Sequence, residues 1–219
     1  LGYHTQAGML ADYHFSDSLN SEVNGAPSMI DLGAPTTYQS GLLSGVPVKA
    51  ITVNQDTGLK VDLSQWQLCS GYSIVLKAKV DHLSFYKKLI DFNDLTSDVG
   101  VYIHSNLAFF HNVRSTLSFT QGQYFQLVMT RDATGLVKIY MTGSHEPEIV
   151  YDDTDDVADL CSGVNGLHFL VDDQQTNSES PRGAVDRITL YDHVLDSVDV
   201  LGLELFDVIF KSDYENTIE

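Results

Sequence analysis

The sequence predicts an all-β protein built as a two-sheet antiparallel sandwich, and three observations lead to this prediction. Short segments rich in β-branched and aromatic residues recur along the 219-residue chain, separated by turn-forming residues. No long segment has the periodicity of an amphipathic helix. Hydrophobic residues make up 43% of the chain, enough for a substantial core. Many half-buried strands must pack their apolar faces together, which gives two stacked sheets.

The first part of the chain predicts short strands separated by loops. A strand is expected at Ala11–Phe15, and turn formers fill Ser16–Pro27 and Gly33–Pro47. Two further strands are expected at Val48–Val53 and Leu59–Val61.

The middle of the chain predicts a long strand and two hairpins. In Tyr72–Val80 (YSIVLKAKV) the alternating side chains predict a strand with one face in the core and the other exposed to solvent. The other expected segments are a strand at Phe85–Phe92, a loop at Asn93–Asp98, a hairpin of Val99–His104 and Leu107–His111, a hairpin of Gln123–Thr130 and Leu136–Met141, and a short edge strand at Glu148–Tyr151.

The most informative stretch lies near the end of the chain. The apolar run His168–Val171 ends in Asp172 and Asp173, and the polar loop that follows carries Glu179. The strand Ala184–Tyr191 comes next. Two strands joined by an acidic loop are suited to a hard cation, which prefers oxygen ligands, rather than to covalent chemistry.

The chain is expected to form one domain, with a core over about residues 9–205. After the last long strand, Asp196 is positioned as a helix N-cap, with Asp199 three residues on. Residues 206–219 are expected to add a strand or serve as a linker.

Charge and cysteine content narrow the function. Thirty acidic residues oppose 12 basic ones, a net charge of −18, which argues against nucleic acid or an anionic membrane as the main partner. This balance fits a divalent cation, a cationic ligand or simple solubility. No apolar run is long enough to span a membrane, so no insertion is expected. Cys69 and Cys161 either close a large loop in an oxidising compartment or stay as two buried thiols.

Three segments carry a resemblance to a known group. Leu89–Phe110 has a strand ending "DF", a loop ending "SD" and a glycine–tyrosine strand; Gln126–Asp132 ends in a "TRD" turn; and His168–Leu203 carries a "DD…E" loop and a closing strand ending "LYD". Together they resemble the bacterial laminin-G-like, concanavalin-A-type jelly-roll domains. The resemblance implies a jelly roll, but that fold hosts lectins, adhesins, peptide binders and glycanases.

A more distant similarity to pentraxins implies a calcium site between two loops. Carried over by position, the first loop corresponds to Ser97-Asp98 and the second to Asp172, Asp173 and Glu179. The acidic loop departs from the pentraxin sequence, so the ligand of the family does not transfer. Calcium at Asp98, Asp172, Asp173 and Glu179 is therefore one expectation, and a solvated acidic rim is the alternative.

Other candidate residues are expected to have smaller roles. Asp17 and Asp186 form a second candidate metal site if the first and last strands pair, with an ion pair of Asp186 as the alternative. Tyr102 and Phe110 are expected to contact ligand from the solvent side. The acidic run at Asp152–Asp159 is expected to be a solvated loop.

No enzyme constellation is found. The E-x-D-x-x-E strand of glycanases of this fold is absent, as are G-x-S-x-G, P-loop and H-E-x-x-H motifs. The expected function is a non-enzymatic, calcium-dependent recognition or adhesion module that binds glycan or another surface ligand. Its expected setting is a larger secreted or cell-surface bacterial protein, beside other domains. A structural or oligomerisation spacer of an adhesin and a glycan-degrading enzyme remain open.

Overall fold

The computed structural model describes residues 8–33, 37–43, 46–161, 166–173 and 179–203. Its fifteen strands are β1 (Met9–Tyr13), β2 (Ile30–Leu32), β3 (Tyr38–Leu43), β4 (Val46–Val53), β5 (Gly58–Asp62), β6 (Gly71–Val80), β7 (Tyr86–Asp91), β8 (Gly100–His104), β9 (Leu107–Phe110), β10 (Val113–Ser118), β11 (Tyr124–Asp132), β12 (Leu136–Met141), β13 (Ile149–Asp152), β14 (Gly166–Phe169) and β15 (Gly183–Tyr191). The tail predicted at residues 206–219 lies outside the described residues.

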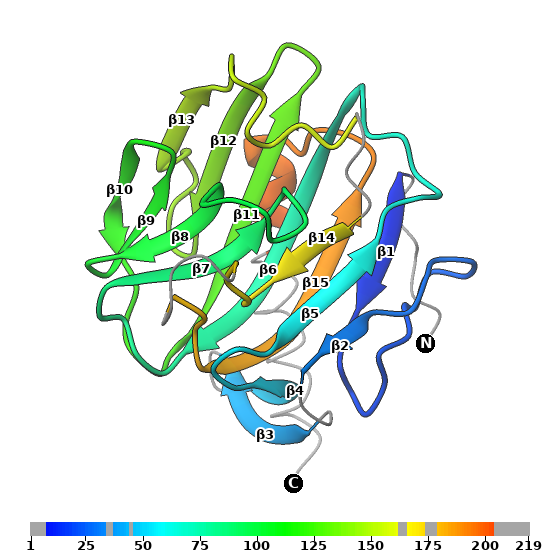
Figure 1. Ribbon diagram of the computed structural model, residues 1–219, viewed down its shortest axis with the longest axis vertical. Helices are drawn as coiled ribbons and strands as arrows, with labels where there is room; N and C mark the ends of the chain where they lie inside the picture. Colours follow the sequence, from blue (N-terminus) through cyan, green and yellow to red (C-terminus); the bar gives the residue numbers. More distant parts are fainter. Residues whose placement is uncertain (1–7, 34–36, 44–45, 162–165, 174–178, 204–219) are drawn as a thin grey trace, which may run out of the picture.

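The strands form two antiparallel sheets that stack as a sandwich, which confirms the predicted fold class (Figure 1). One sheet has the order β13-β12-β11-β6-β15-β4-β3, with β1 also paired to β15. The other has the order β10-β9-β8-β7-β14-β5-β2. The expected pairing of the first and last strands is confirmed, because β1 runs antiparallel to β15 with Asp12 opposite Thr189.

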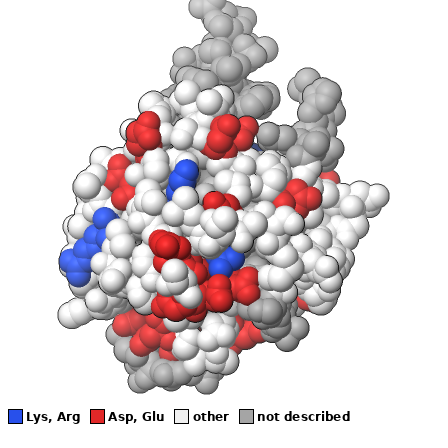
Figure 2. All heavy atoms as spheres, turned by 90° about the horizontal axis from the view of Figure 1, so that it is seen from above, with Lys and Arg blue, Asp and Glu red and all other residues white. Residues whose placement is uncertain are grey.

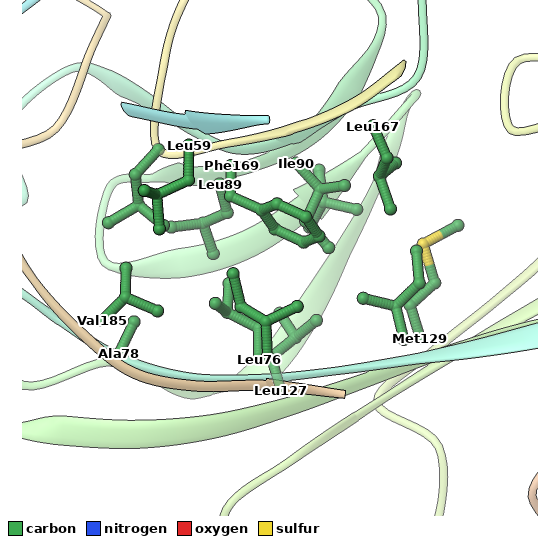
Figure 3. Close-up of a cluster of buried hydrophobic side chains, with 14 of the residues drawn as sticks. Leu59, Leu76, Ala78, Leu89, Ile90, Leu127, Met129, Leu167, Phe169 and Val185 are labelled. Atoms are coloured by element: carbon green, nitrogen blue, oxygen red, sulfur yellow. The ribbon is translucent and has the colours of Figure 1, made fainter. Parts of the chain in front are cut away.

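The core lies between the sheets. Figure 3 shows its two layers facing each other: Leu59, Leu89, Ile90, Leu167 and Phe169 on one side, and Leu76, Ala78, Leu127, Met129 and Val185 on the other. These side chains are fully buried. Alternation along each strand sends every second side chain into this layer, so the apolar period seen in the sequence fixes which face is inside.

The prediction that β6 is wet on one side is wrong. Val75, on its outer face, is buried with Val128, Tyr140 and Tyr191. A helical segment at residues 197–203 contributes Val200 to this second cluster and lies behind β6 and β11 in Figure 1. A short helix therefore covers a sheet face that the sequence pattern alone left to solvent.

The N-cap prediction for this helix is confirmed. The Asp196 carboxylate accepts hydrogen bonds from the backbone N–H groups of Val198 and Asp199 at 2.8 and 2.9 Å. The Asp199 carboxylate accepts one in return from the Asp196 N–H at 3.0 Å. This reciprocal arrangement is a capping box, which satisfies N–H groups that a helix start leaves free.

The expected loop at Gly33–Pro47 is also wrong, because β3 and the start of β4 fall within it. The sequence pattern likewise did not predict β2 and β10. All three missed strands, β2, β3 and β10, lie at sheet edges. An edge strand is held by backbone hydrogen bonds on one side, so its side chains need not follow the alternation that marks an interior strand. No helix in the described parts of the chain is both long and apolar enough to cross a membrane.

Candidate functional site

The candidate site lies beside β7, between the end of β14 and the start of β15. Asp172 and Asp173 are the third and fourth residues after the end of β14, and Glu179 precedes β15. The Glu179 carbonyl accepts a hydrogen bond from the Lys88 backbone N–H at 3.0 Å, so residue 179 lies against β7. Asp98 comes from the loop before β8, the neighbour of β7.

Three of the predicted residues come together in the structure. Asp98, Asp172 and Asp173 each offer one carboxylate oxygen, and these oxygens all lie within 4.8 Å of one another. Asp98 is exposed, whereas Asp172 and Asp173 are 6% and 4% exposed. Two loops far apart in the sequence thus form one acidic group with a buried inner part and an open outer part.

A buried lysine that the sequence reasoning missed lies at the centre of this group. The Lys88 side chain has no exposed surface, and its Nζ is 2.9 Å from Asp173 Oδ2 and 3.1 Å from Asp91 Oδ2. It is also 3.5 Å from Asp172 Oδ1. Lys88 and Asp91 stand three residues apart in a strand that is otherwise mostly apolar, and that was the signal available in the sequence.

The cluster holds more negative than positive charge, and its pKa values reflect this. Burial raises the pKa of Asp172 to about 6. The neighbouring Asp173 charge adds to this effect, whereas the attraction of Lys88 opposes it. Burial and the charges of Asp172 and Asp98 raise the pKa of Glu179 to about 7. Burial and the charge of Asp173 also raise the pKa of Asp98. The carboxylates repel one another by about 3 kcal/mol per close pair at an effective dielectric near 20.

Hydrogen-bond accounting identifies Asp172 as the incompletely satisfied member. Neither of its buried carboxylate oxygens accepts a hydrogen bond of good geometry, and the contact between Oδ1 and Lys88 Nζ is long, at 3.5 Å. Buried polar atoms are normally paired, so such an exception calls for an explanation. A hard cation beside Asp98, Asp172 and Asp173 would satisfy these oxygens and relieve their repulsion, so these three carboxylates fit calcium. The fourth predicted ligand, Glu179, is not in the group of oxygens that lie within 4.8 Å of one another, although its pKa responds to the charges of Asp172 and Asp98.

The two predicted ligand-contact residues have different outcomes. The prediction for Phe110 is wrong: its side chain is fully buried in the core, in contact with Phe92 and Tyr151. Tyr102 is only 5% exposed, but it is not part of the core cluster, and Lys88 Nζ lies 5.3 Å from its ring centre. The aromatic residue paired with Tyr102 across β8 and β9 is Phe109.

Tyr102 and Phe109 line a small hollow of about 80 Å³ that also includes Asp98 and His111. Gly100 forms part of its wall at the start of β8. A Cβ atom there would lie 2.3 Å from the Ile90 carbonyl oxygen, so only glycine allows β8 to begin this close to β7. Because Asp98 both lines the hollow and belongs to the acidic cluster, the two adjoin each other.

The second candidate site is not assembled in the way that was expected. Asp17 forms an ion pair with Lys49. Asp186 lies at a bulge in β15, where its charge helps to raise the pKa of Tyr124 after the larger effect of burial. Among the described residues, no group of three metal-ligating side chains includes either aspartate.

The acidic run at Asp152–Asp159 is not simply a solvated loop, which corrects that expectation. Asp153 is 2% exposed and accepts a hydrogen bond from Arg131 Nε at 2.9 Å, and Arg131 Nη2 donates to Asp156 at 2.8 Å. The run crosses the top of Figure 1, and Figure 2 shows that acidic side chains outnumber basic ones at that end. Cys69 and Cys161 form a disulfide that anchors the end of this run.

Comparison with known proteins identifies the fold but no family. No protein-family model matches the chain, and no curated protein matches it in sequence. Among solved structures, Trypanosoma rangeli sialidase matches with a TM-score of 0.62 at 16% identity over 89% of this chain and 32% of its own. The binding domain of botulinum neurotoxin serotype G matches with a TM-score of 0.61 at 11% identity over 91% of this chain and 51% of its own.

A third match is botulinum neurotoxin type C, whose cell entry depends upon interaction with two ganglioside molecules. Its TM-score is 0.59 at 14% identity, over 94% of this chain and 51% of its own. This chain spans about a third to a half of the length of these matched structures. At such low identity the matches establish a shared β-sandwich fold.

Proposed function

We propose that this chain is a non-enzymatic recognition domain that binds carbohydrate in a calcium-dependent manner. The observation that carries the proposal is the convergence of Asp98, Asp172 and Asp173 within 4.8 Å at the edge of a hollow. The similarity in fold to a ganglioside-dependent toxin supports glycan as the ligand class.

In this proposal the cation is held by Asp98, Asp172, Asp173 and Glu179. Lys88 acts as a fixed internal counter-ion for the deeper carboxylates, Asp91 and Asp173. The cation lowers the repulsion among the outer carboxylates and links the loop that carries Asp98 to Asp172 and Asp173. Calcium accepts six to eight oxygen ligands in flexible geometry, so backbone carbonyls and sugar hydroxyls complete its shell.

Calorimetric titration with calcium at neutral pH tests the metal site. We expect saturable heat for the wild-type protein and for Glu146→Ala, which removes an exposed carboxylate in the β12–β13 turn. We expect at least a 10-fold loss of affinity for Asp172→Ala. Absence of binding heat in the wild-type protein would reject the metal, and equal affinity in Asp172→Ala would reject the site.

The setting that we propose is a larger secreted or cell-surface protein of bacterial origin. The disulfide between Cys69 and Cys161 supports an oxidising compartment, because such bonds persist outside the reducing cytosol. Oxidation state is checked by thiol labelling of the protein isolated from its native source, where two reactive thiols per chain would contradict this assignment.

A glycan hydrolase is a second candidate, because two neighbouring carboxyl groups have raised pKa values, about 6 for Asp172 and about 7 for Glu179. A raised pKa is what a general acid requires near neutral pH. A reducing-sugar assay over a panel of polysaccharides separates the two candidates. Release of sugar that is lost in Glu179→Gln would favour the hydrolase over a binding domain.

The third candidate is a spacer that binds calcium only for rigidity. It is favoured by one feature, the way in which Lys88 ties β7 to the Ser97 carbonyl at 3.2 Å and to Asp173 after β14. A blank glycan array in the presence of calcium, together with a calcium-dependent rise in melting temperature, would favour the spacer.

A further inference from the structure

The hollow beside Asp98 has features of a ligand pocket in addition to the carboxylates of the acidic cluster. Its lining includes two aromatic side chains, Tyr102 and Phe109, which are paired across β8 and β9 and so stand side by side on one face of the sheet. Phe109 is only half-buried, and Tyr86 packs edge-on against it at 5.7 Å between ring centres. Aromatic rings that are fixed by their neighbours offer a rigid apolar surface at little entropic cost.

A buried hydroxyl group gives the hollow a polar anchor. The Tyr102 hydroxyl lies beside Lys88 and Asp98, whose charges act on its pKa, but its contacts with them lack good hydrogen-bond geometry, and Tyr102 is only 5% exposed. Burial of a hydroxyl without a well-aligned partner is unfavourable, and a ligand hydroxyl group would supply that partner. The carboxylate of Asp98, on the rim of the same hollow, is a ready acceptor for ligand hydroxyl groups.

Charge defines which ligands can approach. Five carboxylates, those of Asp91, Asp98, Asp172, Asp173 and Glu179, are grouped with two ammonium groups, Lys88 and the nearby Lys87. A bound divalent cation therefore still leaves the cluster negative, within a chain whose net charge is −18. One cation lies at the hollow itself, because the guanidinium carbon of Arg114 is 5.6 Å from the Phe109 ring centre. The Asp98 carboxylate on the rim and the net negative cluster behind it outweigh this single charge, so an anionic ligand in the hollow is disfavoured relative to a neutral one.

We propose that the hollow lined by Asp98, Tyr102 and Phe109 binds a neutral saccharide ring and discriminates against sialylated and other anionic glycans. The apolar face of the ring lies against Phe109, and its hydroxyl groups bond to Tyr102 and Asp98. This inference rests on the proposed function and narrows it, because it assigns the sugar to one hollow and one charge class.

A glycan array on which each neutral oligosaccharide is printed beside its sialylated counterpart tests the charge class. With calcium present, we expect at least 10-fold stronger binding to the neutral member of the recognised pair. Equal or stronger binding to the sialylated member overturns this inference and leaves carbohydrate recognition standing. Failure to bind any glycan, despite saturable calcium binding, overturns both.

Variants test the position. Tyr102→Phe removes only the buried hydroxyl, and Phe109→Ala removes the half-buried ring; each is expected to weaken the neutral glycan at least 10-fold. Phe85→Ala is the matched control, because Phe85 is 80% exposed and does not line the hollow. Wild-type affinity in both Tyr102→Phe and Phe109→Ala, with thermal unfolding unchanged, places the sugar elsewhere and overturns the inference.

Discussion

Replacement of Lys88 by methionine is the sharpest test of how the acidic site is held together. Methionine has a similar length and no charge, so the change removes the cation while keeping most of the packing. The Lys88 side chain has no exposed surface, and its Nζ lies within 3.5 Å of carboxylate oxygens from Asp91, Asp172 and Asp173. The variant therefore leaves three buried carboxylates without their shared partner.

The expected cost at neutral pH without calcium is about 3–5 kcal/mol, the range measured when one member of a buried ion pair is removed. For a domain of this size that corresponds to a drop in melting temperature of roughly 10 °C. Urea unfolding followed by circular dichroism measures it. Lys49→Met is the control, because the Lys49–Asp17 pair is exposed by 41% and 62% and should contribute less than about 1 kcal/mol.

Two further observations separate an electrostatic cause from a packing defect. Added calcium should restore part of the lost stability of Lys88→Met, because a second cation compensates the same carboxylates. The penalty should also shrink as the pH falls below about 6, because the pKa of Asp172 is about 6 with Lys88 present and the loss of Lys88 raises it further. A variant as stable as the wild-type protein at neutral pH would refute the idea that Lys88 neutralises this cluster.

Three other predictions concern stability. The first follows from Asp172, whose pKa is raised to about 6: without calcium, the folded state binds more protons than the unfolded chain between about pH 4 and 6. The free energy of unfolding should therefore fall as the pH rises through that window. Asp172→Asn should flatten this dependence when the urea midpoint is plotted against pH. The second concerns Asp12: burial acts to raise its pKa, but hydrogen bonds from His14 and Arg187 outweigh burial and hold the pKa well below its usual range. Asp12→Asn should lower the free energy of unfolding by about 3 kcal/mol at pH 7 and by less as the pH falls below 4. A loss that does not change with pH would contradict this. The third concerns the disulfide between Cys69 and Cys161, which closes a loop with a sequence separation of 92. Its reduction, or the double variant Cys69→Ser with Cys161→Ser, should lower the free energy of unfolding in denaturant by about 4–5 kcal/mol. A loss below about 1 kcal/mol would show that the bond does not constrain the unfolded chain.

Local signals predicted much of the fold correctly. Alternating apolar residues located the interior strands, as at β11 and β12, and Asp132 set the hairpin turn between them by accepting hydrogen bonds from the Thr134 and Leu136 N–H groups at 2.8 and 3.0 Å. The hairpin of Val99–His104 and Leu107–His111 was also predicted from local sequence, and the two residues between its strands, Ser105 and Asn106, adopt positive φ angles. The alternation of apolar residues did not predict the edge strand β10, because backbone pairing with β9 holds that strand without an alternating side-chain pattern.

Strand phase explains the error at Phe110. Two aromatic residues stand next to each other in β9, and alternation requires one to face the core and the other to face outward. The register with β8 places Val101 opposite Phe110 and Tyr102 opposite Phe109. The sequence offered both choices, and only the pairing of the strands decided between them.

The sequence by itself determined that the chain is an acidic β-sandwich and that carboxylates gather in the connections after two of its strands, because alternation and turn chemistry act over a few residues. Only the tertiary structure decided that Asp98 meets Asp172 and Asp173, that Lys88 lies among them, and that Cys69 bonds to Cys161. These contacts join segments up to 92 residues apart, and they depend on sheet order and strand register, which no local pattern encodes.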